Sequence, residues 1–141
     1  MKAAQIFQIV NVVAIVGWLL IAILPTWVGT RAIVLNGAIP LLLAVAYTVL
    51  ILLFFSSAEG GFGSLPDVMK LFTNEWAVLA GWIHYLAFDL IIGSWEVEDA
   101  NARGVPHLWV IPCLVLTFLF GPIGYLAYNI IRLIPRKEHG T

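Results

Sequence analysis

Charged side chains are scarce in this chain. Only 11% of its 141 residues are Asp, Glu, Lys or Arg, and the formal net charge is -1. Proteins that bind nucleic acids neutralise phosphates with clustered Lys and Arg, so we expect no nucleic-acid partner. Cysteine is almost absent too, because Cys113 is the only one. A single cysteine cannot form an intrachain disulfide, and we expect Cys113 to be a small buried residue.

Motifs that bind nucleotides are missing as well. The chain contains no Gly-x-Gly-x-x-Gly sequence and no phosphate-binding loop, which are the usual signatures of dinucleotide and nucleotide sites. It also lacks the Gly-x-Ser-x-Gly sequence that places a nucleophilic serine on a sharp turn. We therefore predict no nucleotide cofactor, and the polar residues present favour proton transfer over redox chemistry.

Apolar residues, in contrast, are abundant. They make up 62% of the chain, which has a mean hydropathy of +1.00 and six tryptophans. Soluble domains are about 45–50% apolar, and tryptophan favours the edges of a bilayer. The first apolar run is long enough to stay in the membrane and lacks the cleavage site of a signal peptide. We interpret the chain as a multi-pass integral membrane protein with one domain over residues 1–141.

Four segments are candidates for crossing the membrane. A spanning helix needs about 20 mainly apolar residues, and four runs meet this need: residues 6–24, 38–55, 76–93 and 108–131. Thr73 or Asn74 can cap the third. Pro112 and Pro122 each remove a backbone donor from the fourth, which predicts a kink. The expected fold is an all-α four-helix transmembrane bundle with a kinked fourth helix.

The connection between the second and third segments contains a further helical pattern. Leu65, Val68, Met69 and Phe72 recur at helical spacing after a Gly-rich stretch. This pattern predicts a short helix on the membrane surface, serving as a lid or as a simple connection.

The distribution of basic residues predicts an orientation. Four full spans would place five basic residues on one side, namely Lys2, Lys70, Arg132, Arg136 and Lys137, against Arg31 and Arg103 on the other. Cytoplasmic loops carry the excess of Lys and Arg. Both termini are therefore predicted to be cytoplasmic, or stromal in a plastid.

The third segment carries ionisable residues within its apolar run. At 100° per residue, Trp82, Tyr85, Asp89 and Glu96 share one stripe, whereas His84 lies about 140° from Asp89. His84 and Asp89 therefore cannot form a dyad within one ideal helix. An ionisable residue at membrane depth is costly and by default marks a functional site.

Asp89 is the main catalytic candidate. A protonated carboxylic acid can donate its proton to an ether or epoxide oxygen, and it can act as a base once ionised. The alternative is a structural role, in which Asp89 bonds Tyr85 or a polar residue of another helix.

The remaining polar residues lie beyond the third segment. Glu96 continues the Asp89 stripe and is expected to frame the mouth of a cavity. Glu98 and Asp99 are expected to lie in a solvated loop, where Arg103 can pair with a carboxylate. His107 can cap the next helix or carry a proton.

A metal site is a further alternative that the sequence leaves open. Imidazole and carboxylate suit Zn, Fe or Mn, so His84, His107, Asp89 and Glu96 form a conceivable ligand set. Their spacing matches no metal-binding motif, and we assign no metal.

Three stretches carry a resemblance to a known family: HYLAFDLIIGSW at residues 84–95, ARGVPH at 102–107 and IPCLVLTFLFGPIGYLAY at 111–128. Together they resemble the abscisic-acid-deficient-4 family of small four-span membrane proteins. Its plant members are linked to the formation of neoxanthin from violaxanthin in plastid membranes. The resemblance implies an epoxide-opening isomerisation without net redox change. This chain has no transit peptide, which favours a bacterial or mature form with a carotenoid, retinoid or other terpenoid as substrate.

We therefore expect an isomerase of a carotenoid-like lipid in a bacterial inner membrane or a plastid membrane. Asp89 is the expected acid, His84 or Glu96 the base, and His107 a further catalytic candidate. The predicted substrate-binding residues are Trp82, Tyr85, Trp95 and Arg103, with the aromatic rings flanking a polyene. Two alternatives remain: a non-catalytic pigment-binding or scaffold protein, and a proton or ion pathway. A homo-oligomer or a carotenoid-enzyme partner is left open.

Overall fold

The computed structural model describes residues 2–134, and every regular element among them is helical. The all-α prediction is therefore confirmed. In chain order the elements are α1 (Ala3–Ile23), α2 (Val28–Thr30), the π-helix η1 (Arg31–Leu35), α3 (Ala38–Phe54), the 3₁₀ turn η2 (Phe55–Ser57), α4 (Leu65–Leu71), α5 (Glu75–Ala102), α6 (His107–Phe120) and α7 (Pro122–Ile131).

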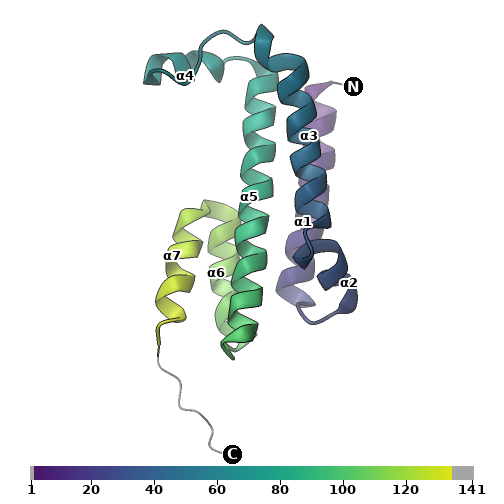
Figure 1. Cartoon of the computed structure of the whole chain (residues 1–141), viewed down its shortest axis with the longest axis vertical. Coiled ribbons are helices and arrows are strands. Elements are labelled where there is room, and N and C mark those ends of the chain that lie inside the picture. The colour runs from purple at the N-terminus through teal and green to yellow at the C-terminus, as the bar shows by residue number, and fades with distance from the viewer. Residues whose placement is uncertain (1, 135–141) are drawn as a thin grey trace, which may run out of the picture.

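Three helical segments are long and apolar enough to cross a membrane: Ala3–Ile23, Val28–Ser57 and Glu75–Ala102. They correspond to the first three predicted spans, although α1 ends one residue before the predicted end at residue 24. The central helix is α5, which packs against α1, α3 and α6 (Figure 1). Side chains without solvent exposure join these helices, including Ile21 of α1, Ile83 and Leu90 of α5, and Leu43 of α3 at 1% exposure.

Helix α5 is longer than the sequence indicated. It begins after Asn74, whose side chain accepts hydrogen bonds from the backbone N–H groups of Trp76 and Ala77 at 2.9 and 3.2 Å. It then continues to Ala102, so the predicted loop around Glu98 and Asp99 is wrong. The helix persists because Val97 and Ala100 extend its buried apolar face past the membrane-length run.

The fourth predicted span is not a kinked helix but a hairpin. Helix α6 ends at Phe120, and α7 begins at Pro122 and runs back beside it (Figure 1). Gly121 makes this reversal possible because its φ of 48° and ψ of -94° lie in a region that side chains rarely allow. Pro122 suits the first position of a helix. Gly124 permits the close approach, since a Cβ there would collide with Thr117.

The predicted short helix is confirmed as α4, which extends sideways from the end of the bundle (Figure 1), and its place on the membrane surface stays a prediction. Ser64 caps it by accepting a hydrogen bond from the Asp67 N–H at 3.3 Å. An ion pair of 2.9 Å between Lys70 and Glu59 ties α4 to the preceding loop. The hydrogen bond from Lys70 holds the pKa of Glu59 below its usual value.

The hairpin also affects the predicted orientation of the termini, which stays a prediction. Because α7 returns toward the end of α5 at which α6 began, the N-terminal end of α1 and the C-terminal end of α7 lie at opposite ends of the molecule (Figure 1). Lys2 and Lys70 lie at the first end, whereas Arg31, Arg103 and Arg132 lie at the second. Arg136 and Lys137, which also entered that prediction, lie outside the described residues.

Cysteine labelling in intact membranes tests the hairpin. In a Cys113→Ser background, Phe62→Cys and Leu133→Cys probe two exposed positions, 76% and 77% accessible, at opposite ends of the molecule. We expect an impermeant thiol reagent to label them from opposite sides of the membrane. A fourth full span would place both on the same side, so labelling from one side would contradict the hairpin.

Candidate functional site

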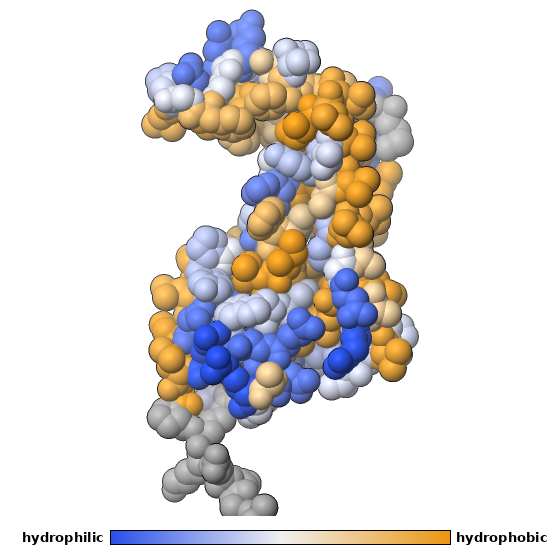
Figure 2. Space-filling view, in the orientation of Figure 1, coloured by the Kyte–Doolittle hydropathy of each residue, from blue (hydrophilic) through white to orange (hydrophobic). Residues whose placement is uncertain are grey.

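A recess opens on one side of α5, between α4 and the α6–α7 hairpin (Figure 2). It exists because α6 has 14 residues and α5 has 28. At 1.5 Å per residue the hairpin reaches about 21 Å along a helix of about 42 Å. Half of this side of α5 is therefore left uncovered by the hairpin, along its apolar stretch.

Aromatic side chains and His84 line the upper part of this recess. A cavity of about 280 Å³ lies between α3, α4 and α5 and is lined by residues that include Tyr47, Phe62, Phe72 and His84. The His84 ring stacks on Phe88 with the centroids 4.6 Å apart, and Tyr47 lies 5.6 Å from it. His84 is exposed, so its imidazole is available to a molecule in the recess.

Asp89 lies at the lower edge of the recess, against the hairpin turn. A Cβ placed on Gly121 would lie 2.9 Å from Asp89 Oδ1, so the turn backbone passes directly over the carboxylate. Asp89 Oδ2 has no hydrogen-bond partner among the described residues. Tyr85, one turn earlier, donates its hydroxyl to the Phe118 carbonyl at 2.6 Å and lies close enough to interact with Asp89.

His84 and Asp89 do not meet, but they border the same open face of α5. The helical phase separates them by about 140°, and Tyr85 and Phe88 fall within that sector. Each lies about 100–120° around the helix from the buried positions Ile83 and Leu90, so the sector between them is opposite the buried face. A molecule lying across this sector would have an imidazole on one flank and a carboxylate on the other.

Glu96 is buried rather than placed at a cavity mouth, which corrects the expected position. Its side chain has no solvent exposure. The Thr117 hydroxyl donates a hydrogen bond of 2.9 Å to Glu96 Oε1, while Oε2 has no partner within the described part of the chain. Because Thr117 belongs to α6, this contact joins the hairpin to α5 (Figure 1). A buried carboxyl with an unused oxygen is costly, which marks Glu96 as unusual.

A second polar cluster holds the C-terminal end of α5, around Asp99. Asp99 Oδ2 accepts a hydrogen bond from the Tyr128 hydroxyl at 2.7 Å and forms ion pairs with Arg103 at 2.8 Å and Arg132 at 3.3 Å. The Arg132 guanidinium also lies 5.3 Å from the centre of the Trp95 ring. Arg103 and Trp95 therefore belong to this cluster and not to the recess.

The sequence did not single out Asp99, although one signal was present. Asp99 and Arg103 are four residues apart, which on a helix makes them neighbours. The predicted pairing of Arg103 with a carboxylate is confirmed with Asp99, but it occurs within a helix and not in the expected loop.

His107 lies far along α6 from the Asp89 turn, at the first residue of the helix. Its Nε2 forms a hydrogen bond of 2.9 Å with the Ala22 carbonyl at the end of α1. The conceivable metal set is thus not brought together. Within residues 2–134, no group of three or more His, Cys, Asp or Glu side chains could hold a metal ion.

The family model described as ABA DEFICIENT 4-like matches residues 5–128, which include α5 and the turn at Gly121. The chain belongs to the ABA DEFICIENT 4-like family. This family is associated with neoxanthin synthesis. No curated protein and no solved structure matches the chain.

The Gly121 turn can be tested against a matched glycine. Gly104 also has a positive φ, of 65°, but nothing lies within 4 Å of an added Cβ, whereas Gly121 faces Asp89. We expect Gly104→Ala to lower the free energy of unfolding by about 1 kcal/mol, and Gly121→Ala to lower it by about 3 kcal/mol or more through backbone strain and the clash. Denaturation in detergent measures both values, and equal losses would contradict the crowding at Asp89.

Proposed function

We propose that this protein is a membrane-embedded isomerase that opens an epoxide on a carotenoid-like lipid by proton transfer. The observation that carries the proposal is the half-buried Asp89 carboxyl, held by the hairpin turn at the edge of an aromatic recess, with its buried Oδ2 unpartnered among the described residues. Family membership supports the same substrate class. The three long apolar helices support placement in a bacterial inner membrane or a plastid membrane.

The recess suits the ring end of a polyene. Its rim includes exposed aromatic side chains, with Phe88 at 55% and Phe72 at 50% exposure, whereas Trp82 packs against Phe7 of α1 and donates a hydrogen bond of 3.1 Å to Asn11. Such rings pack well against apolar rings and can stabilise positive charge that develops on a substrate. A cavity of about 280 Å³ is at the lower limit for drug-sized ligands, about 300 Å³, so the polyene tail would lie in the surrounding lipid.

The reaction follows from the positions of the two flanking groups. Protonated Asp89 gives its proton to the epoxide oxygen as one ring carbon–oxygen bond breaks, which leaves a hydroxyl on the other ring carbon. A base removes the proton from the neighbouring chain carbon. The electron pair of that carbon–hydrogen bond becomes a new carbon–carbon double bond, so an allene forms and no oxidant is consumed.

His84 is the better candidate for the base. Glu96 has no exposed surface and is engaged with Thr117 beneath the hairpin, so a lipid in the recess cannot touch it. His84 is exposed on the opposite flank of the open sector. Trp82 and Tyr85, whose ring centres are 5.2 Å apart, would line the substrate beside Asp89. Glu96 would then act indirectly, by holding the hairpin that covers Asp89.

Pigment analysis tests the catalytic role of Asp89. In a host that makes epoxidised carotenoids, we expect the native chain to produce an allenic isomer of unchanged mass. Asp89→Asn should reduce its yield about 100-fold or more, since general acid catalysis contributes 10² or more. Glu75→Gln, an exposed carboxyl on the same helix, is the matched control. Chromatography with mass detection measures both variants at equal protein levels, and equal product from native and Asp89→Asn chains would refute the assignment.

A non-catalytic pigment-binding protein is the alternative. The exposed aromatic rim would hold a polyene in either case, whether or not a reaction follows. It predicts an unmodified carotenoid that copurifies at a fixed ratio with a shifted absorption spectrum. Asp89→Asn would then keep both the ratio and the spectrum.

A further inference from the structure

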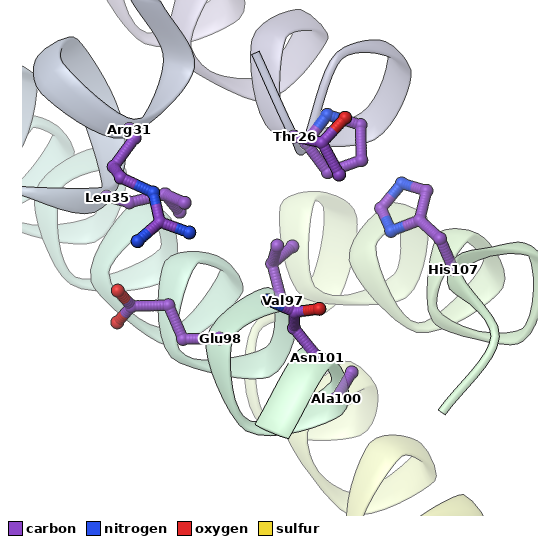
Figure 3. Close-up of a pocket in the computed structure, with 9 residues that line it drawn as sticks. Thr26, Arg31, Leu35, Val97, Glu98, Ala100, Asn101 and His107 are labelled. Atoms are coloured by element: carbon purple, nitrogen blue, oxygen red, sulfur yellow. The ribbon is translucent and has the colours of Figure 1, made fainter. Parts of the chain in front are cut away.

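A second cavity, of about 120 Å³, lies at the C-terminal end of α5, and Figure 3 shows the residues that line it. Its walls come from the connection after α1, the π-helix η1, the last turns of α5 and the start of α6. The polar side chains around it are Thr26, Arg31, Glu98, Asn101 and His107. Neither the recess nor the proposed reaction uses any of these side chains, although the sequence predicted a catalytic role for His107.

The two charged residues face one another across this cavity without pairing. Figure 3 shows the Arg31 guanidinium and the Glu98 carboxylate pointing toward each other from η1 and α5. No salt bridge within 4.0 Å joins them, and neither side chain makes a hydrogen bond within the described residues. Opposite charges that share a cavity without contact leave room for a ligand with both signs of charge.

Two more hydrogen-bonding groups complete the wall. The Asn101 side chain has no hydrogen-bond partner in the described part of the chain, and its amide can donate or accept. His107 uses Nε2 for the Ala22 carbonyl, so Nδ1 remains available. The π-helix that carries Arg31 is an uncommon element found frequently at functional sites.

The position of the cavity points to the source of its ligand. It lies at the end of the molecule where polar residues gather (Figure 2) and where Arg103 and Arg132 also lie. If α1, α3 and α5 cross the bilayer, this end is at the level of the lipid headgroups. About 120 Å³ is well below the 300–1,000 Å³ of pockets for drug-sized ligands, so the cavity fits a small polar group.

We propose that this cavity binds the phosphoethanolamine headgroup of a membrane lipid. The guanidinium of Arg31 binds the phosphate oxygens, as arginine does in other phosphate sites, and the Asn101 amide adds a donor. Glu98 accepts hydrogen bonds from the primary ammonium. A quaternary ammonium has no N–H to donate, so a choline headgroup would bind less well. A glycerol headgroup would leave Glu98 beside an anion without compensation.

Native mass spectrometry of the full chain in detergent tests this site. The probes are phosphatidylethanolamine, phosphatidylcholine and phosphatidylglycerol with identical acyl chains. We expect phosphatidylethanolamine to bind about tenfold more tightly than the other two. Glu98→Gln should abolish that preference while phosphatidylglycerol still binds. Arg31→Gln should weaken all three, because each carries the phosphate. Glu75→Gln, at the other end of α5, is the control and should change nothing.

Three results would overturn the proposal. The first is equal binding of the three lipids to the native chain. The second is competition by soluble phosphoethanolamine in the absence of lipid binding, which would assign the site to a free metabolite. The third is a lower melting temperature of both lipid-free variants with unchanged lipid preference, which would make Arg31 and Glu98 an ordinary ion pair. None of these outcomes depends on the isomerase, whose test is Asp89→Asn.

Discussion

The reversal of the chain at Gly121 is the constraint on which the arrangement of the candidate site depends. A residue with a side chain could adopt φ 48° and ψ -94° only with strain, and the next residue, Pro122, cannot continue the hydrogen bonding of α6. The reversal lets α7 return beside α6, with Thr117 held against Glu96 and Tyr128 against Asp99. Those two contacts fix the position of the turn along the α5 axis. At that position the turn backbone passes over Asp89.

Two polar contacts of different character hold the hairpin to α5. The contact between Thr117 and Glu96 is fully buried, where a carboxyl left without a partner is costly. The contacts of Asp99 with Arg103 and Arg132 are partly exposed, where ion pairs contribute about 0–1 kcal/mol. The buried contact therefore specifies the position of α6, and the exposed cluster restrains the end of α7. Glu96 belongs to the α5 stripe of Trp82 and Asp89, and Asp99 follows Glu96 by about one helical turn.

Much of the fold follows from the sequence, because hydropathy and capping are local signals. The first three apolar helices, the cap at Asn74 and the short helix α4 are of this kind. The hairpin is not, because a Gly-Pro pair is compatible with a kink or a reversal, and only packing against α5 selects the reversal. The same reason explains Glu96: its helical phase was readable, but its burial comes from Thr117, which is 21 residues away in sequence. Arg31 and Glu98 lie still further apart in the chain, and no sequence pattern links them.

The α6–α7 hairpin covers only about half the length of α5, which affects how molecules reach this helix. If α5 crosses a bilayer, the recess faces acyl chains and not water, so an oily molecule would arrive by lateral diffusion without leaving the lipid. The recess also lies toward the α4 end of the molecule, so it would open mainly to the lipids of one leaflet. A long molecule with two identical ends, lying across the bilayer, would present one end at a time to this recess. A single chain would thus bind one half of a symmetric lipid in the recess while the other half stays outside it.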